Sequence, residues 1–197
     1  PNSQAENDIR PIATTCPIYK IAETCIDKFF TEHFNLVLDE NQFGSTRGRS
    51  TTLALIKFSN MLFEASDDCF NFIRILFIDF SKAFDVIDHN VLLKKFVDYN
   101  FPPHVVLWSL SFLQDRKQFV KIGDLFSDVN VINAGTPQGT RAGPNNFKLL
   151  INDLQFDLPY IKYVDDITVA LISHDPNNNS LQGAVDCLSD WCNENGM

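Results

Sequence analysis

Two features that would quickly assign a class are missing from this sequence: metal-binding cysteine motifs and long apolar runs. The chain has 5 cysteines and 4 histidines, but no cysteine pair has the C-x-x-C spacing and the histidines are scattered. We therefore expect free thiols in a reducing compartment and no zinc site. No apolar stretch approaches the roughly 18 residues of a membrane-spanning helix. The polar N-terminal stretch shows no signal-peptide pattern, so we expect no membrane association.

Basic charge is also scarce. The chain has 16 lysines and arginines against 25 aspartates and glutamates, which gives a net charge of −9 at pH 7. This balance argues against a protein that coats nucleic acid, because such proteins have a basic surface. An enzyme with a local basic groove remains compatible with it, since acidic residues gathered at a metal centre would themselves lower the net charge.

Methionine and tryptophan are rare, with 2 of each, whereas phenylalanine occurs 18 times. With 45% hydrophobic residues over 197 positions, the chain can bury a core built largely on phenylalanine, as one domain or two small lobes. It starts at Pro1 without an initiator methionine and stops at Met197, directly after a helix-like stretch. We therefore expect a fragment of a longer protein.

Hydrophobic spacing predicts helices and strands without a regular βαβ alternation, which is typical of the α+β class. Residues 71–78 form a nearly continuous apolar run, which predicts a strand buried on both faces. Ser50 or Thr51 can cap a helix, and Gly196 can end the last one. Helices are expected at about 17–37, from about 51, at 88–98, 103–114 and 145–156, and from about 181; hairpins at 117–132 (turning at Gly123 and Asp124) and 161–171; loops at 41–48 and 135–144.

Two adjacent carboxylates, Asp165 and Asp166, lie between the strand-like stretches 161–164 and 167–171. We expect the pair to form the hairpin turn, because along a strand the two side chains would point to opposite faces. Carboxylates held close together repel each other unless a cation compensates. Magnesium, which takes one or two carboxylates with waters and substrate phosphates, is the natural cation. The similar pair at 67–68 has no strand flanks and is interpreted as a solvated turn.

A third carboxylate, Asp79, ends the apolar run 71–78. An unpaired charge at the edge of a core is unfavourable, so Asp79 is a candidate third ligand for two metal ions that drive an in-line displacement at phosphorus. Two simpler interpretations stay open: Asp79 caps the next helix, and Asp165 and Asp166 form an ordinary solvated turn.

The loop G135-T-P-Q-G-T140 is the third notable feature. Pro137 and Gly139 favour an open backbone on which a ligand can lie closely, and Gln138 offers both a donor and an acceptor. Pro-Gln-Gly alone is also compatible with a plain turn.

Three stretches occur in the order I-D-F-S-K-A-F-D (78–85), G-T-P-Q-G-T-R-A-G-P (135–144) and Y-V-D-D (163–166), and in that order they resemble the reverse transcriptases. Four further stretches are similar to elements of the non-LTR, LINE-like retrotransposon type. They are R-P-I-A-T-T-C-P-I-Y-K-I-A-E (10–23), Q-F-G-S-T-R-G-R-S-T (42–51), F-K-L-L-I-N-D-L (147–154) and W-C-N-E-N-G (191–196). The resemblance covers the chain from about residue 10 to its end.

The resemblance implies an α+β fold: the fingers and palm of a right-hand polymerase, with an antiparallel palm sheet flanked by helices and without a thumb. Residues 1–197 would be a single domain fragment, about 1–70 fingers-like and about 71–197 palm with some fingers segments. The implied activity is RNA-directed DNA synthesis, in which deoxynucleoside triphosphates extend a DNA primer on an RNA template with two Mg²⁺ ions or Mn²⁺. A thumb and an endonuclease would belong to the longer protein, so the fragment alone is expected to be inactive.

The resemblance also implies roles for individual residues. Asp79, Asp165 and Asp166 are similar to the family's catalytic, metal-binding carboxylates, of which Asp166 is the least tightly engaged. Phe84 matches the position whose ring blocks a ribose 2′-hydroxyl, and a core phenylalanine is the alternative. The other implied nucleotide-binding residues are Phe80, Gln138, Gly139, Arg10 and Arg49.

The sequence departs from the family pattern at three places: Ser45-Thr46 stand where Phe-Arg is usual, Arg141-Ala142 replace a commoner apolar pair, and Val164 stands where LINE-type enzymes more often carry alanine. Two rival functions stay open. One is a degenerate or domesticated remnant that binds nucleic acid without catalysis, and the other is a metal-dependent hydrolase with a carboxylate cluster. The resemblance alone suggests an intracellular ribonucleoprotein, nuclear or cytoplasmic.

Overall fold

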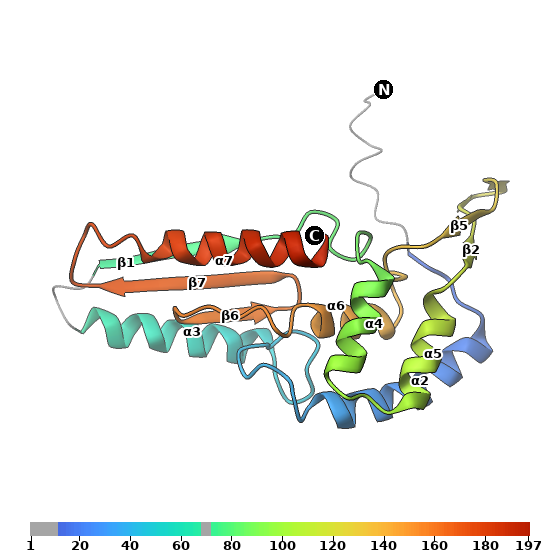
Figure 1. The fold of residues 1–197 in the computed structure, drawn as a ribbon, viewed down its shortest axis with the longest axis horizontal. Coiled ribbons are helices and arrows are strands. Elements are labelled where there is room, and N and C mark those ends of the chain that lie inside the picture. Colours follow the sequence, from blue (N-terminus) through green and yellow to red (C-terminus); the bar gives the residue numbers. More distant parts are fainter. Residues whose placement is uncertain (1–11, 68–71) are drawn as a thin grey trace.

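The computed structural model describes residues 12–67 and 72–197, so Arg10 lies outside the described residues. One half of the molecule is built on an antiparallel sheet of three strands in the order β1–β7–β6 (Figure 1). These strands are β1 (Phe72–Ile78), β7 (Asp166–Ser173) and β6 (Tyr160–Tyr163). Helix α7 (Ser180–Asn195) lies along β7, and helix α3 (Thr51–Ser66) packs against β6.

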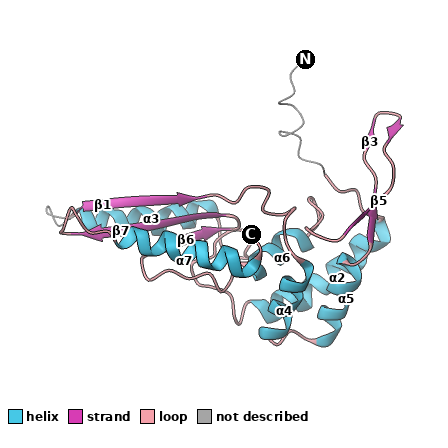
Figure 2. Cartoon of the chain, turned by 45° about the horizontal axis from the view of Figure 1, so that its top comes forward, coloured by secondary structure: helices cyan, strands magenta, loops and turns pink. Residues whose placement is uncertain are grey.

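The other half is helical (Figure 2). Its helices pack around phenylalanine side chains, of which Phe34, Phe96 and Phe147 are at most 2% exposed, and this confirms the predicted phenylalanine core. No described helix has both the length and the apolar composition required to cross a membrane. The helices are α2 (Pro17–Phe34), α4 (His89–Asp98), α5 (Pro103–Leu113) and α6 (Ala142–Leu150).

Local signals in the sequence placed several element ends correctly. The Ser50 side chain accepts a hydrogen bond from the Leu53 amide at 3.2 Å and caps α3. Gly196 ends α7 in the left-handed conformation with φ of 69°. The hairpin after α5 turns at Gly123 and Asp124, as predicted. It pairs β2 (Arg116–Gln118) with β5 (Asn130–Ile132) and β3 (Lys121–Ile122) with β4 (Leu125–Phe126).

The prediction that the strand at 71–78 is buried on both faces is wrong. β1 is an edge strand of the sheet, and its side chains Ile75 and Phe77 are 37% and 74% exposed. Leu76 and Ile78 pack against the main core instead. The shorter apolar run 167–171, in β7, forms the buried centre of the sheet instead. An apolar run in the sequence therefore does not distinguish an edge strand from a central one.

The helix predicted at 145–156 begins earlier and ends earlier, at Ala142 and Leu150. Pro144 does not delay its start, because the first backbone amides of a helix have no partner within it and proline is tolerated there. The first helix likewise ends at Phe34 and not near 37.

Candidate active site

The chain turns between β6 and β7 at Val164 and Asp165, because Tyr163 and Asp166 form the last pair of the hairpin. The prediction that Asp165 and Asp166 form the turn is therefore wrong by one residue. Val164 has φ of 57°, and a positive φ at only the first residue of a two-residue loop is the pattern of a type II′ turn. For a β-branched residue this conformation costs about 1–3 kcal/mol and persists only where the surroundings hold it.

Asp79 follows directly after β1, and the preceding residue, Ile78, pairs with Ile167. The sheet therefore brings the backbone of Asp79 beside the turn that carries Asp165. The interpretation of Asp79 as a helix cap is wrong, because the next helix, α4, is capped by the side chain of Asp88.

The chemistry of this end of the sheet suits a hard divalent cation. Asp79 and Asp166 are exposed, and Asp165 is half-buried. Across residues 12–67 and 72–197, no three His, Cys, Asp or Glu side chains form a group that could hold a metal ion. Carboxylate oxygens are ligands that magnesium accepts, one or two at a time, together with waters and substrate phosphates. The metal-ligand roles of Asp79, Asp165 and Asp166 stay predictions.

Loop 135–140 packs against segment 82–87. Two backbone amides of the loop donate to carbonyl groups of the segment, each at 2.8 Å. The Gln138 Nε2 donates to an Asp85 carboxylate oxygen at 3.1 Å, and the Gln138 carbonyl accepts from the Ala13 amide at 2.8 Å. Two of the three stretches that carry the sequence resemblance are therefore in direct contact.

Both phenylalanines predicted to bind nucleotide contact the core. The rings of Phe80 and Phe84 lie with their centroids 5.8 and 5.3 Å from that of Phe147, and Phe80 also lies 6.2 Å from Trp191. Both side chains are only partly buried, so packing and nucleotide contact are compatible. Gly139 is exposed with φ of 88°. The nucleotide-binding roles of these residues stay predictions.

Arg49 makes structural contacts. Its Nη1 donates to the carbonyl oxygens of Glu40 and Asp39 at 2.8 and 3.3 Å, and its guanidinium lies 5.4 Å from the centre of the Phe43 ring. Arg49 thereby fastens the loop between α2 and α3. Its predicted contact with nucleotide stays a prediction, and Arg10 lies outside the described residues.

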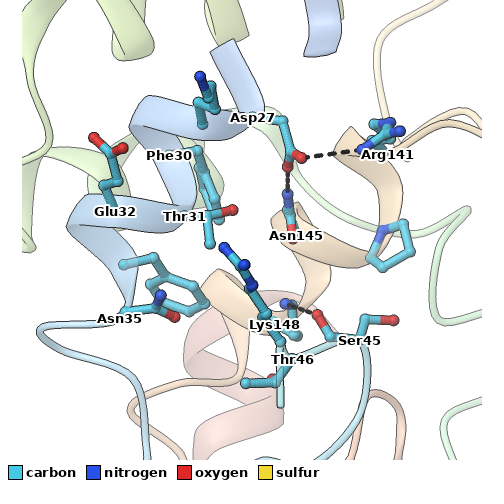
Figure 3. Close-up of a pocket in the computed structure, with 14 residues that line it drawn as sticks. Asp27, Phe30, Thr31, Glu32, Asn35, Ser45, Thr46, Arg141, Asn145 and Lys148 are labelled. Carbon is cyan, nitrogen blue, oxygen red and sulfur yellow. Dashed lines mark hydrogen bonds and ion pairs between the residues drawn. The ribbon is translucent and has the colours of Figure 1, made fainter. Parts of the chain in front are cut away.

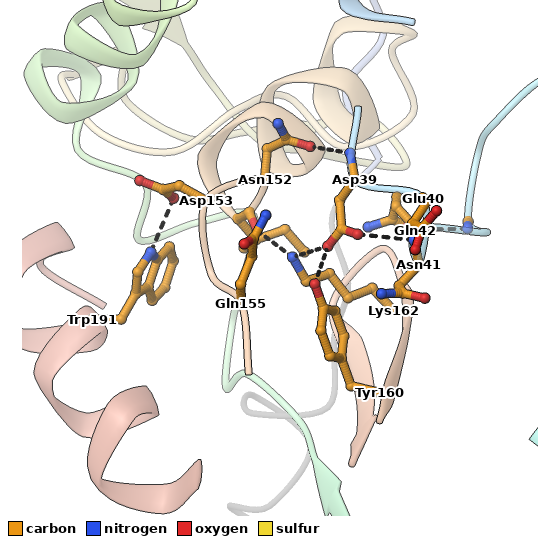
Figure 4. A network of polar contacts seen from close by, with 12 residues as sticks. Asp39, Glu40, Asn41, Gln42, Asn152, Asp153, Gln155, Tyr160, Lys162 and Trp191 are labelled. Atoms are coloured by element: carbon orange, nitrogen blue, oxygen red, sulfur yellow. Dashed lines mark hydrogen bonds and ion pairs between the residues drawn. The ribbon is translucent and has the colours of Figure 1, made fainter. Parts of the chain in front are cut away.

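A buried ion pair next to the hairpin was missed by the sequence analysis (Figure 4). The Lys162 Nζ lies 2.7 Å from the Asp39 Oδ2 and donates to the Ile151 carbonyl at 2.9 Å. Asp39 also accepts from the Tyr160 hydroxyl at 3.0 Å and from the Asn41 amide at 2.8 Å. The lysine inside the strand-like stretch 161–164 was the available signal, but its partner lies in a distant loop.

Burial dominates the protonation equilibria of this network. It lowers the pKa of Lys162, and the neighbouring Asp39 only partly offsets this. Burial also raises the pKa of the Tyr160 hydroxyl to about 12. The network links the loop after α2 to the strand that leads into the turn at Asp165.

A second lysine, Lys148, borders a cavity of about 500 Å³ between α2, α6 and the loop at 45–47 (Figure 3). Its Nζ donates to the Ser45 carbonyl at 2.6 Å. Asp27 on the same cavity pairs with Arg141 at 3.5 Å and accepts a hydrogen bond from the Asn145 side-chain Nδ2 at 2.6 Å. Burial lowers the pKa of Lys148 to about 8, with Asp27 opposing the change.

This pKa predicts how stability changes with pH. Below about pH 8 Lys148 is protonated in both the folded and the unfolded chain. Between about pH 8 and 10.5 Lys148 is protonated only in the unfolded chain, so the unfolding free energy rises with pH. The difference corresponds to at most about 3 kcal/mol. Across this window we expect the unfolding free energy of the wild type to rise by up to that amount relative to Lys148→Met, measured by urea denaturation. The exposed cavity residue Lys28, changed to Met, is the control, and an equal effect there would contradict the assignment.

One end of the β1–β7–β6 sheet carries a carboxylate after β1 and two more at the β6–β7 turn, an arrangement that agrees with the palm expected of a right-hand polymerase. The model of the family "Reverse transcriptase (RNA-dependent DNA polymerase)" matches residues 1–197, and the chain belongs to that family. Among curated proteins, it is 28% identical over 205 residues to a probable RNA-directed DNA polymerase from transposon BS of Drosophila melanogaster. It is also 28% identical over 162 residues to the RNA-directed DNA polymerase from mobile element jockey of the same species.

These matches cover 96% and 76% of this chain but only 22% and 18% of the two relatives. Among solved structures, apo telomerase from Candida tropicalis, truncated from the C-terminal domain, has a TM-score of 0.61 at 12% identity. The match covers 84% of this chain and 36% of the telomerase chain. Telomerase from Candida albicans with a fragment of telomeric RNA has a TM-score of 0.58 at 13% identity, matching 92% and 32%. At these identities the likeness concerns the fold, and it agrees with the predicted α+β fingers and palm.

Proposed function

We propose that the protein containing this chain is the RNA-directed DNA polymerase of a non-LTR retrotransposon. It extends a DNA primer on an RNA template with deoxynucleoside triphosphates. The observation that carries the proposal is the pairing of Ile78 with Ile167, which brings Asp79 to the turn of Asp165. The family match and the two retrotransposon relatives support it.

In this proposal Asp79 and Asp165 hold two divalent ions, with Asp166 as a weaker ligand. The ions, Mg²⁺ or Mn²⁺, would favour the ionised primer 3′-oxygen and offset charge on the phosphates. Loop 135–139 lies against the incoming nucleotide, and the ring of Phe84 excludes a ribose 2′-hydroxyl. Phe80, Arg10 and Arg49 complete the proposed nucleotide contacts.

Residues of about 1–70 would act as fingers, and about 71–197 as palm with some fingers segments. The remaining partners would come from the longer protein, which would supply a thumb and an endonuclease. Its template RNA would place it in a nuclear or cytoplasmic ribonucleoprotein. The rival of a metal-dependent hydrolase would need further His or carboxylate ligands, and the described residues hold no group of three such side chains. The polymerase proposal instead takes one or two carboxylates for each ion, with waters and substrate phosphates as the other ligands.

Primer extension by the longer protein tests this proposal. Asp165→Asn keeps the size of the side chain but removes its charge, and we expect a loss of at least about 100-fold, since metal-held charge contributes several kcal/mol to such transition states. Asp67→Asn makes the same change at the exposed end of α3, and we expect it to leave extension unchanged. Equal activity in Asp165→Asn and the wild type would refute catalysis at this site. A wild type that binds primer–template but extends nothing would favour the non-catalytic remnant.

A further inference from the structure

The loop after α2 lies against the outer edge of β6. The Lys162 amide donates to the Asn41 carbonyl at 2.9 Å, and the Phe43 amide donates to the Lys162 carbonyl at 2.8 Å. Gln42, between them, is 1% exposed and forms an isolated parallel bridge with Lys162. Figure 4 shows Gln42 next to the buried ion pair of Asp39. This loop therefore has a fixed position relative to the strand that enters the β6–β7 turn.

From this position the Gln42 side chain reaches the turn itself. Its Oε1 accepts two hydrogen bonds, from the amides of Val164 and Gly44, each at 2.9 Å. Gly44 lies so close to the turn that an added Cβ would be 2.5 Å from the Val164 nitrogen. The carboxamide and the loop backbone thus hold Val164 from the free edge of β6.

Val164 is the residue whose backbone most needs such support. It is β-branched and has a positive φ of 57°, and the next residue is Asp165. Releasing its amide would let the turn relax towards conformations with negative φ, and this would change the position of the adjacent Asp165 carboxylate.

We propose that Gln42 is a positioning residue of the polymerase: its carboxamide oxygen holds the Val164 amide and thereby sets where the Asp165 carboxylate lies for the metal ions. This inference rests on the proposed function. The Gln42 Nε2 is buried without a hydrogen-bond partner among the described residues. The oxygen therefore provides the contacts that the turn uses.

The experiment uses the longer protein and the variant Gln42→Met, which keeps the length of the side chain but has no comparable acceptor. We expect kcat to fall about 10- to 100-fold and the Mg²⁺ concentration for half-maximal rate to rise, as for partners that orient metal ligands. KM for primer–template is expected to change less than about twofold, since the interaction fixes the reacting geometry and not primer–template binding. Gln182→Met makes the same change on the exposed face of α7 and should alter neither constant.

A rescue variant separates positioning from general destabilisation. Glycine adopts a positive φ without strain, so Val164→Gly in the Gln42→Met background should reduce the loss to about threefold relative to Val164→Gly alone. An undiminished loss in that background would overturn the proposal, and so would a Gln42→Met enzyme with unchanged kcat and Mg²⁺ dependence.

Hydrogen exchange at the Val164 amide distinguishes this proposal from the proposed function, because it needs no catalysis. We expect exchange in Gln42→Met to be at least about fivefold faster, in line with the loss of one hydrogen bond. If exchange is faster in Gln42→Met but the wild type extends no primer, the proposed function is refuted, whereas the hydrogen bond that holds the turn is supported. Unchanged exchange would overturn the positioning role even in an active polymerase.

Discussion

Replacing Asp39 with alanine is expected to lower the unfolding free energy of the 197-residue chain by about 3–5 kcal/mol, because it leaves a buried charge without its partner. Lys162 is 0% exposed, and its Nζ contacts only the Asp39 carboxylate and the Ile151 carbonyl among the described polar groups. After the substitution one neutral acceptor would remain for a protonated ammonium group. Urea denaturation at pH 7 measures the loss.

Two further variants test that reason. Lys162→Met should cost less, because Asp39 keeps hydrogen bonds from the Tyr160 hydroxyl and the Asn41 amide. The double variant Asp39→Ala/Lys162→Met should be more stable than Asp39→Ala alone, since no buried charge remains unpaired. A double variant whose losses simply add would contradict the account.

The cost of Asp39→Ala should also depend on pH. Burial already lowers the pKa of Lys162 in the folded state, and removing the carboxylate lowers it further. The unfolded lysine keeps its proton up to its ordinary pKa, so stability rises with pH below that value. We expect the difference in unfolding free energy between Asp39→Ala and the wild type to become smaller as the pH approaches 10.

The sequence predicted the features that depend on nearby residues. Apolar spacing located α2, the Ser50 hydroxyl started α3, and Gly196 ended α7, since each signal acts within about one helical turn. The prediction that the strand at 71–78 is buried on both faces failed because exposure depends on the order of strands in the sheet, which places β1 at the edge.

The site was predicted in a different way. The order of three motifs indicated Asp79, Asp165 and loop 135–140 through a family resemblance, and the register of the sheet agrees by bringing Asp79 to the β6–β7 turn. The exact turn was missed because a valine with positive φ has no signal in sequence propensities. Gln42 and Asp39 were missed because their contacts with Val164 and Lys162 connect residues more than 100 positions apart.

The loop at 135–140 leads to the second large expected effect: Gly135→Ala should lower the unfolding free energy by about 2–5 kcal/mol or prevent folding. Gly135 has φ of 72°, and an added Cβ would lie 2.6 Å from the Asp85 carbonyl oxygen and 2.9 Å from its carbon. Positive φ alone costs about 1–2 kcal/mol for alanine, and overpacking adds about 1–3 kcal/mol. The clash involves backbone, so segment 82–87 would have to move, and with it the contact between Gln138 and Asp85.

Two other glycines separate these terms. Gly123 has φ of 60° with no atom within 4 Å of an added Cβ, so Gly123→Ala should cost only the backbone term of about 1–2 kcal/mol. Gly183 lies inside α7, also with open space around an added Cβ and no positive φ, so Gly183→Ala should stabilise by about 0.5–1 kcal/mol. Thermal or urea denaturation of the three variants should therefore rank them Gly183, Gly123, Gly135 in decreasing stability. If Gly135→Ala cost no more than Gly123→Ala, the close packing of the glycine loop on the segment after Asp79 would be refuted.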